Sequence, residues 1–164
     1  MTSDLRRLPA LLSLVAVACL SLPAQADRNP PMSKDAFEAA EERIESAARK
    51  ERKACDRLKG RPAELCVVQA KAGEKVARAE LEAEYEPGLE TWQDARDARA
   101  AADYAVAREK CDDFKGAAKA RCVQAAKSAR EAAIRLAKVE KVAAMRAAER
   151  EAAAERKALA RAKP

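Results

Sequence analysis

Apolar residues recur at helical spacing along most of this chain, and they predict four helices. The first is expected from Asp35 to about Lys59, the second from Pro62 to about Tyr85, the third from Thr91 to a break at Gly116, and the fourth from that break to about Ala143. Within each segment the apolar positions lie three, four or seven residues apart, which places them on one side of a helix. The pattern therefore predicts an all-α protein.

Residues with special backbone preferences mark the predicted helix ends. Asp35 and Thr91 are the expected N-caps, each followed by an acidic residue three positions on, which is the pattern of a capping box. Gly60 and Gly116 suit the left-handed conformation that often ends a helix. The predicted breaks make each pair of helices a hairpin.

Most of the predicted apolar stripes consist of alanine. The stripe of the second helix is Leu65, Val68, Ala72, Val76, Ala79 and Ala83, and that of the fourth is Cys122, Ala125, Ala129, Ala132, Leu136, Val139 and Ala143. Alanine buries little area, and burial stabilises by roughly 25 cal/mol per Å². The helices are therefore expected to share only a thin core.

One twelve-residue stretch occurs twice, with an offset of 56 residues. It runs from Cys55 to Cys66 and again from Cys111 to Cys122, both copies contain Cys-Asp and Lys-Gly at matching positions, and a Val follows the last Cys of each. The two predicted N-caps also stand 56 residues apart. This agreement indicates an internal duplication.

The paired cysteines are interpreted as two structural disulfides, Cys55–Cys66 and Cys111–Cys122. In each copy the cysteines lie five residues before and six residues after the glycine, where they can face each other across a helical hairpin. Closing so short a loop contributes roughly 2–3 kcal/mol. A metal site and a redox site are the alternatives. The chain has no His and no Cys-x-x-Cys, which argues against both.

The first 26 residues have the pattern of a bacterial secretory signal. A basic start is followed by an apolar run over 8–22 and by Ala24-Gln25-Ala26, which predicts cleavage after Ala26. The alternatives are an uncleaved anchor and a lipoprotein attached through Cys19. Cleavage would leave four cysteines, an even number that suits the periplasm.

The expected organisation therefore has five parts. They are a signal peptide (1–26), a flexible leader (27–34), a first hairpin (35–86), a second hairpin (91–143) and a charged, Ala-rich helical extension (144–164). The two tandem disulfide-closed helical hairpins could form a four-helix bundle or an elongated antiparallel coiled coil with an overhanging last helix. Similar helix lengths favour the bundle, and the thin core favours the open form; of the two, the bundle is the favoured expectation.

The composition argues against an enzyme. Of all residues 37% are charged and 3% aromatic, and no His is present, so the commonest general base is missing. Neither a Gly-rich phosphate loop nor a nucleophile elbow is found. We expect no catalytic residues, no cofactor, no metal and no small-molecule substrate.

The basic excess suggests two kinds of partner. The formal net charge is +6 and becomes +5 without the signal peptide. Lipopolysaccharide, phospholipid or nucleic acid could bind the basic residues near the C-terminus. These are Arg146, Arg150, Arg156, Lys157, Arg161 and Lys163. Acidic residues are interleaved with them, however, which is typical of a solvated helix. The favoured expectation is an envelope protein or a second copy bound through the Ala-rich helix faces.

The signal, the duplicated Cys-x10-Cys hairpin and the Ala/Lys/Glu-rich helices together resemble uncharacterised bacterial periplasmic proteins. Over residues 125–164 the composition is also similar to the periplasmic stalk of TolA-type envelope proteins. These resemblances imply a helical protein with a role in the cell envelope. The expected function is therefore that of a non-enzymatic structural or interaction protein.

Overall fold

The computed structural model describes residues 31–162, and these residues form four α-helices without any strand. The helices are α1 (Lys34–Cys55), α2 (Arg61–Tyr85), α3 (Leu89–Lys110) and α4 (Gly116–Ala162), with a short 3-10 turn, η1 (Cys111–Asp113), before α4. The expected all-α fold with two disulfide-closed hairpins is confirmed. The predicted signal peptide, its cleavage after Ala26, Cys19 and Lys163 lie outside the described residues.

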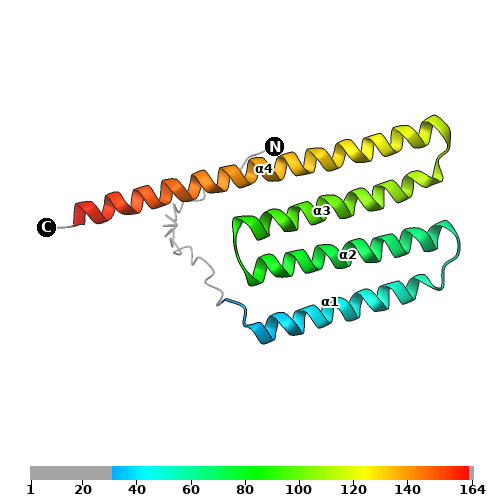
Figure 1. Ribbon diagram of the computed structural model, residues 1–164, viewed down its shortest axis with the longest axis horizontal. Helices are drawn as coiled ribbons and strands as arrows, with labels where there is room; N and C mark the ends of the chain where they lie inside the picture. The colour runs from blue at the N-terminus through cyan, green and yellow to red at the C-terminus, as the bar shows by residue number, and fades with distance from the viewer. Residues whose placement is uncertain (1–30, 163–164) are drawn as a thin grey trace, which may run out of the picture. The chain divides into compact units, whose positions relative to one another are not determined.

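The four helices lie side by side in chain order, up, down, up and down, as Figure 1 shows. Substantial packing joins α1 to α2, α2 to α3 and α3 to α4. Burial in the two central helices explains this order. Ala70 and Ala72 are both buried in α2, and Ala100 and Ala102 are both buried in α3. Residues two apart point about 200° apart around a helix, so each central helix packs on two opposite sides.

The four helices form a single layer and do not close into the bundle that similar lengths favour. The first three helices have 22, 25 and 22 residues, as expected, but α4 has 47. The largest buried side chains between α2 and α3 are Val76 and the alanines beside it. Such small side chains fill a seam between two helices but leave little to fill the centre of a bundle.

Two predicted helix starts are displaced. The N-cap of α1 is Ser33, whose hydroxyl accepts a hydrogen bond from the backbone N–H of Ala36 at 3.2 Å, and the predicted cap Asp35 lies inside the first turn. The helix α3 begins at Leu89 rather than Thr91, and the Thr91 hydroxyl donates to the carbonyls of Glu86 and Gly88. Gly60 and Gly116 have the expected positive φ, 61° and 52°, but both lie at helix starts rather than at helix ends. Gly60 is the N-cap of α2 and Gly116 is the first residue of α4, whereas α1 already ends at Cys55 and α3 at Lys110.

Apart from Cys122, the predicted apolar stripe of the last helix is exposed. The residues of α4 that are buried against α3 are Ala126 and Ala137, whereas Leu136 is 59% and Val139 66% exposed. Two ion pairs fix this rotation by tying α3 to α4, Arg96 to Glu140 and Glu90 to Lys141. Alanine lies on several sides of α4, so it can pack on α3 without using its larger apolar side chains. No helix of residues 31–162 is long and apolar enough to cross a lipid bilayer.

Candidate functional site

Both predicted disulfides close the same end of the helical layer. Cys55–Cys66 and Cys111–Cys122 each have a Cα–Cα distance of 5.6 Å, which is the usual separation for a disulfide. Cys55 and Cys111 are almost fully buried. Within residues 31–162, no group of three or more His, Cys, Asp or Glu is placed to hold a metal ion. The disulfides staple each hairpin and indicate an oxidising compartment outside the cytoplasm.

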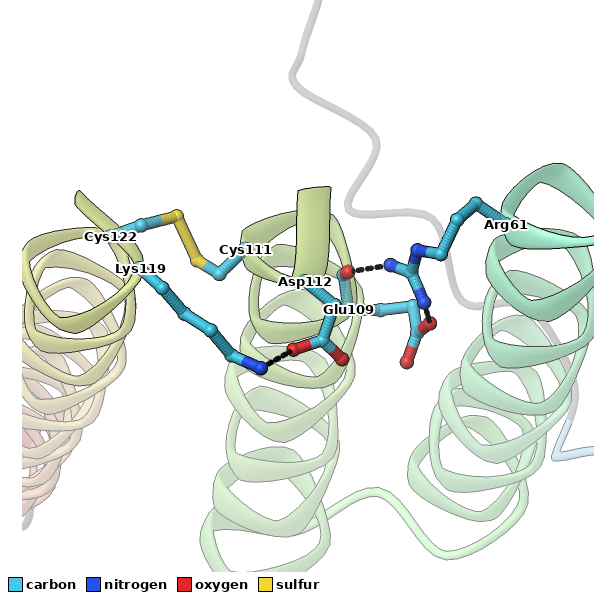
Figure 2. The surroundings of a disulfide bond; sticks show 6 residues. All are labelled: Arg61, Glu109, Cys111, Asp112, Lys119 and Cys122. Atoms are coloured by element: carbon cyan, nitrogen blue, oxygen red, sulfur yellow. Dashed lines mark hydrogen bonds and ion pairs between the residues drawn. A yellow bond between two sulfur atoms is a disulfide. The ribbon is translucent and has the colours of Figure 1, made fainter. Parts of the chain in front are cut away.

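Arg61 joins the two hairpins near the end of α3, next to the turn that the Cys111–Cys122 disulfide closes (Figure 2). It begins α2 and donates to the Glu109 carboxylate at 2.5 Å, to the Glu109 carbonyl, and to Asp113 at 3.1 Å. A further bond to Glu64 lies within α2. Hydrogen bonds to Asp113, Glu109 and Glu64 raise the pKa of the Arg61 guanidinium. Arg61 therefore stays charged and supplies a donor to the end of α3, where backbone carbonyls lack helical partners.

A second ion pair lies inside the second turn. Lys119 of α4 contacts Asp112 of η1 at 2.5 Å, and Figure 2 shows this pair next to the Cys111–Cys122 disulfide. The Lys119 ammonium holds the pKa of Asp112 below its ordinary value of 3.8. Asp112 is therefore a poor proton donor near neutral pH. This end of the layer is suited to holding the fold together rather than to acid–base chemistry.

One face of the layer is hollowed along its middle. A groove of about 500 Å³ runs between α2 and α3, a hollow of about 300 Å³ lies between their other ends, and one of about 110 Å³ lies between α3 and α4. The three adjoin, because Arg99 lines all of them. We call this surface the Arg99 face. It combines a concave surface with a row of charged residues along α3.

The large groove of the Arg99 face has a small-residue floor and charged edges. Gly73, Ala77 and Val106 line its centre, and a Glu80–Arg99 ion pair spans it from α2 to α3. The Arg99 guanidinium donates to the Glu80 carboxylate, and this hydrogen bond raises the pKa of Arg99. A floor of small side chains lets another helix approach closely, and the charges can fix its orientation.

The opposite face of the same two helices is different. Its groove of about 240 Å³ is lined by alanines, Val68 and two lysines, Lys71 and Lys75. Both lysines are exposed. This face carries no acidic side chain at the groove, so it lacks the mixed charges of the Arg99 face.

The predicted polyanion contacts lie on the part of α4 that extends past α3. The pair between Glu90 and Lys141 marks where α3 begins, and the residues Arg146, Arg150, Arg156, Lys157 and Arg161 all follow it and are exposed. Helical geometry puts all of these except Arg156 within a sector of about 60°. The acidic residues Glu149, Glu151 and Glu155 lie outside that sector. The overhang therefore has one basic side.

The pattern of apolar residues did not predict the bonds of Arg61 to the second hairpin or the Arg99 face. Both depend on which helices become neighbours, and local spacing carries no information on that. One signal was present, because Glu109 and Asp113 replace the Lys53 and Arg57 of the first copy. Such a charge reversal between duplicated positions points to a contact made by one copy alone.

Comparison of the chain with protein-family models, with curated proteins and with solved structures finds no match. The fold and the disulfides define the class: an all-α protein of two disulfide-closed hairpins, suited to an extracytoplasmic compartment.

Proposed function

We propose that this chain is a non-enzymatic structural or interaction protein of the bacterial cell envelope, which works in the periplasm after removal of residues 1–26. The observation that carries the proposal is the Arg99 face, a concave apolar surface with charged edges on a disulfide-stapled scaffold. Grooves between helices are a common place for a partner helix to dock. The disulfides support a role outside the cytoplasm.

Two carboxylates, Glu74 and Asp112, are held in ion pairs that support a role without catalysis. Glu74 accepts from Arg52 at 2.5 Å and from Arg78 at 3.2 Å, and chiefly the Arg52 bond lowers its pKa. Asp112 is held in the same way by Lys119. A general acid or base works best with a pKa near the operating pH, and these shifts go in the wrong direction.

Photo-crosslinking in intact cells tests the proposal. A photoreactive amino acid at Ala77, on the floor of the Arg99 face, is expected to give a discrete crosslinked product with an envelope protein or with a second copy. The matched control is the same amino acid at Lys75, on the opposite face of α2. Equal products from both positions, or none from Ala77, would contradict the proposed role.

A second candidate function is binding to an anionic polymer or membrane surface. The basic side of the α4 overhang favours it, because Arg146, Arg150, Lys157 and Arg161 share one sector of the helix. Binding to anionic vesicles, lipopolysaccharide or DNA should then weaken steeply as salt is raised.

Neutralising this basic side separates the two candidates. Replacing its four residues with Gln should abolish binding to the anionic probes, while the same change at Lys50, Lys53, Lys71 and Lys75 should not. Absence of binding at low salt, or an equal loss in both variants, would reject the polyanion role.

A further inference from the structure

The ridge of α3 forms the middle of the Arg99 face. Arg99, Asp103, Ala107 and Lys110 follow one another at spacings of four, four and three residues, so they share one side of the helix. All four line the groove of about 500 Å³ between α2 and α3. Whatever covers the Arg99 face therefore meets this ridge.

Two charged residues on the ridge have no ion-pair partner in the described part of the chain. Arg99 is paired with Glu80, whereas Asp103 and Lys110 are exposed and form no ion pair within residues 31–162. They have opposite signs and lie seven residues apart, or about 10.5 Å along the helix. Ala107 lies between them and is small enough to let a second helix cross closely.

We propose that the Arg99 face docks a second copy of this chain, with the two α3 helices antiparallel and crossing at Ala107. Asp103 of each copy then meets Lys110 of the other, so one pair of residues supplies two ion pairs. A two-fold interface has this property, because each residue and its partner exchange places between the copies. A parallel arrangement would bring Asp103 against Asp103, which is unfavourable.

The same arrangement covers the apolar surface beside the ridge. Ala77 and Val106 line the groove on one side of α3, and the exposed Leu136 lines the hollow on the other. Covering this surface favours association at roughly 25 cal/mol per Å², and the charges select the orientation. Packing of a second layer is the usual way in which helices bury such faces. The inference rests on the proposed interaction role, because it uses the same face.

Charge reversal tests the docking of a second copy. Sedimentation velocity of the oxidised protein is expected to show a dimer that dissociates on dilution. Asp103→Lys and Lys110→Asp each place like charges opposite one another, and each should raise the dimer Kd at least about tenfold. The double variant Asp103→Lys/Lys110→Asp exchanges both signs, so it should recover the original Kd to within about threefold.

The matched control is Lys75→Asp, which reverses an exposed charge on the opposite face and should leave the Kd unchanged. Asp103 and Lys110 are exposed, so the circular dichroism spectra of all variants should coincide. A protein that stays monomeric at every concentration overturns the proposal. So do single reversals without effect, or a double variant as weak as the single ones.

A photoreactive amino acid at Ala107 separates this inference from the proposed function. Crosslinks between two copies in cells support self-docking. A crosslink to a different protein in place of a second copy overturns self-docking and keeps the interaction role. A monomer that crosslinks to nothing contradicts both.

Discussion

The two disulfide-closed turns have the same covalent closure and different charges beside it. Each disulfide joins cysteines 11 positions apart, and each turn has a glycine with positive φ. Each also exposes one large apolar residue just before its Lys-Gly pair, Leu58 in the first turn and Phe114 in the second. The closure of a hairpin is thus repeated almost unchanged.

Two charges beside the turns are reversed. At positions 56 residues apart, Lys53 and Arg57 of the first hairpin become Glu109 and Asp113 of the second. The guanidinium of Arg61 lies between the hairpins and bonds to both of these acids. Basic residues at the same place would repel it. The disulfides therefore close each hairpin, and the changed charges let Arg61 bond the second hairpin to the first.

Removal of a disulfide is expected to have the largest effect. The variants Cys55→Ala/Cys66→Ala and Cys111→Ala/Cys122→Ala should each lose about 3 kcal/mol of unfolding free energy, because a loop of equal length is opened in both. Urea unfolding followed by circular dichroism measures the two losses. If one variant is as stable as the oxidised protein, the two closures are not equivalent.

Loss of the Arg61 bonds between the two hairpins is expected to lower the stability of the fold by less than loss of a disulfide. Arg61→Ala removes the bonds to Asp113 and to both Glu109 acceptors and leaves the Glu109 side chain, which is only 17% exposed, without its partner. The thermal midpoint should fall, by less than on removal of a disulfide. The control is Arg57→Ala, an exposed residue of the first turn, which should leave the midpoint nearly unchanged.

The salt dependence of the Arg61→Ala effect tests whether ion pairs join the hairpins. The difference in thermal midpoint between the original protein and Arg61→Ala should become smaller at high salt, because partly exposed ion pairs are screened. If the Arg57 variant is as destabilised as the Arg61 variant, the charge reversal between the turns is not what joins the hairpins.

The parts of the fold that sequence could predict depend on local signals. Helical spacing places the four helices, the left-handed preference of Gly60 and Gly116 marks the two turns, and cysteines on both sides of each glycine give the disulfides. Each signal lies within about a dozen residues. Such signals are independent of which helices become neighbours later.

The remaining features depend on contacts between distant residues. The stripe predicted for α4 contains Leu136, yet Ala126 and Ala137 pack on α3, because alanines on several sides make more than one rotation of α4 possible. The single layer has a related cause, since alanine seams can join helices in pairs but do not specify a common centre. The Arg99 face follows from that layer, so neither could be predicted from spacing.

Acidification should weaken both hairpins, the first more than the second. Arg52 lowers the pKa of Glu74 below its ordinary value of 4.5, and Lys119 lowers that of Asp112 below 3.8. A carboxyl with a lowered pKa stabilises the fold above its ordinary pKa, and this contribution is lost as pH falls through the lowered value. Glu74→Gln and Asp112→Asn should therefore be less stable than the original protein at neutral pH.

The thermal midpoint between about pH 5 and pH 2 measures this contribution. The difference in thermal midpoint between each variant and the original protein should disappear in acid. At neutral pH this difference should be larger for Glu74→Gln than for Asp112→Asn, because the Glu74 side chain is 19% exposed and that of Asp112 is 34% exposed. A gap that stays constant with pH would mean that the amide variants lost packing rather than a charge interaction.

The smallest expected effect concerns the apolar residue that both turns expose. Leu58 is 43% and Phe114 is 48% exposed, so Leu58→Ala and Phe114→Ala should each change the unfolding free energy by no more than about 0.5 kcal/mol. Val76→Ala, in the buried seam between α2 and α3, is the comparison and should cost about 1.5 kcal/mol. Urea unfolding at one pH measures all three. If either turn variant costs as much as Val76→Ala, the exposed apolar residue belongs to the closure of its hairpin, and the similarity of the two turns extends beyond the disulfide.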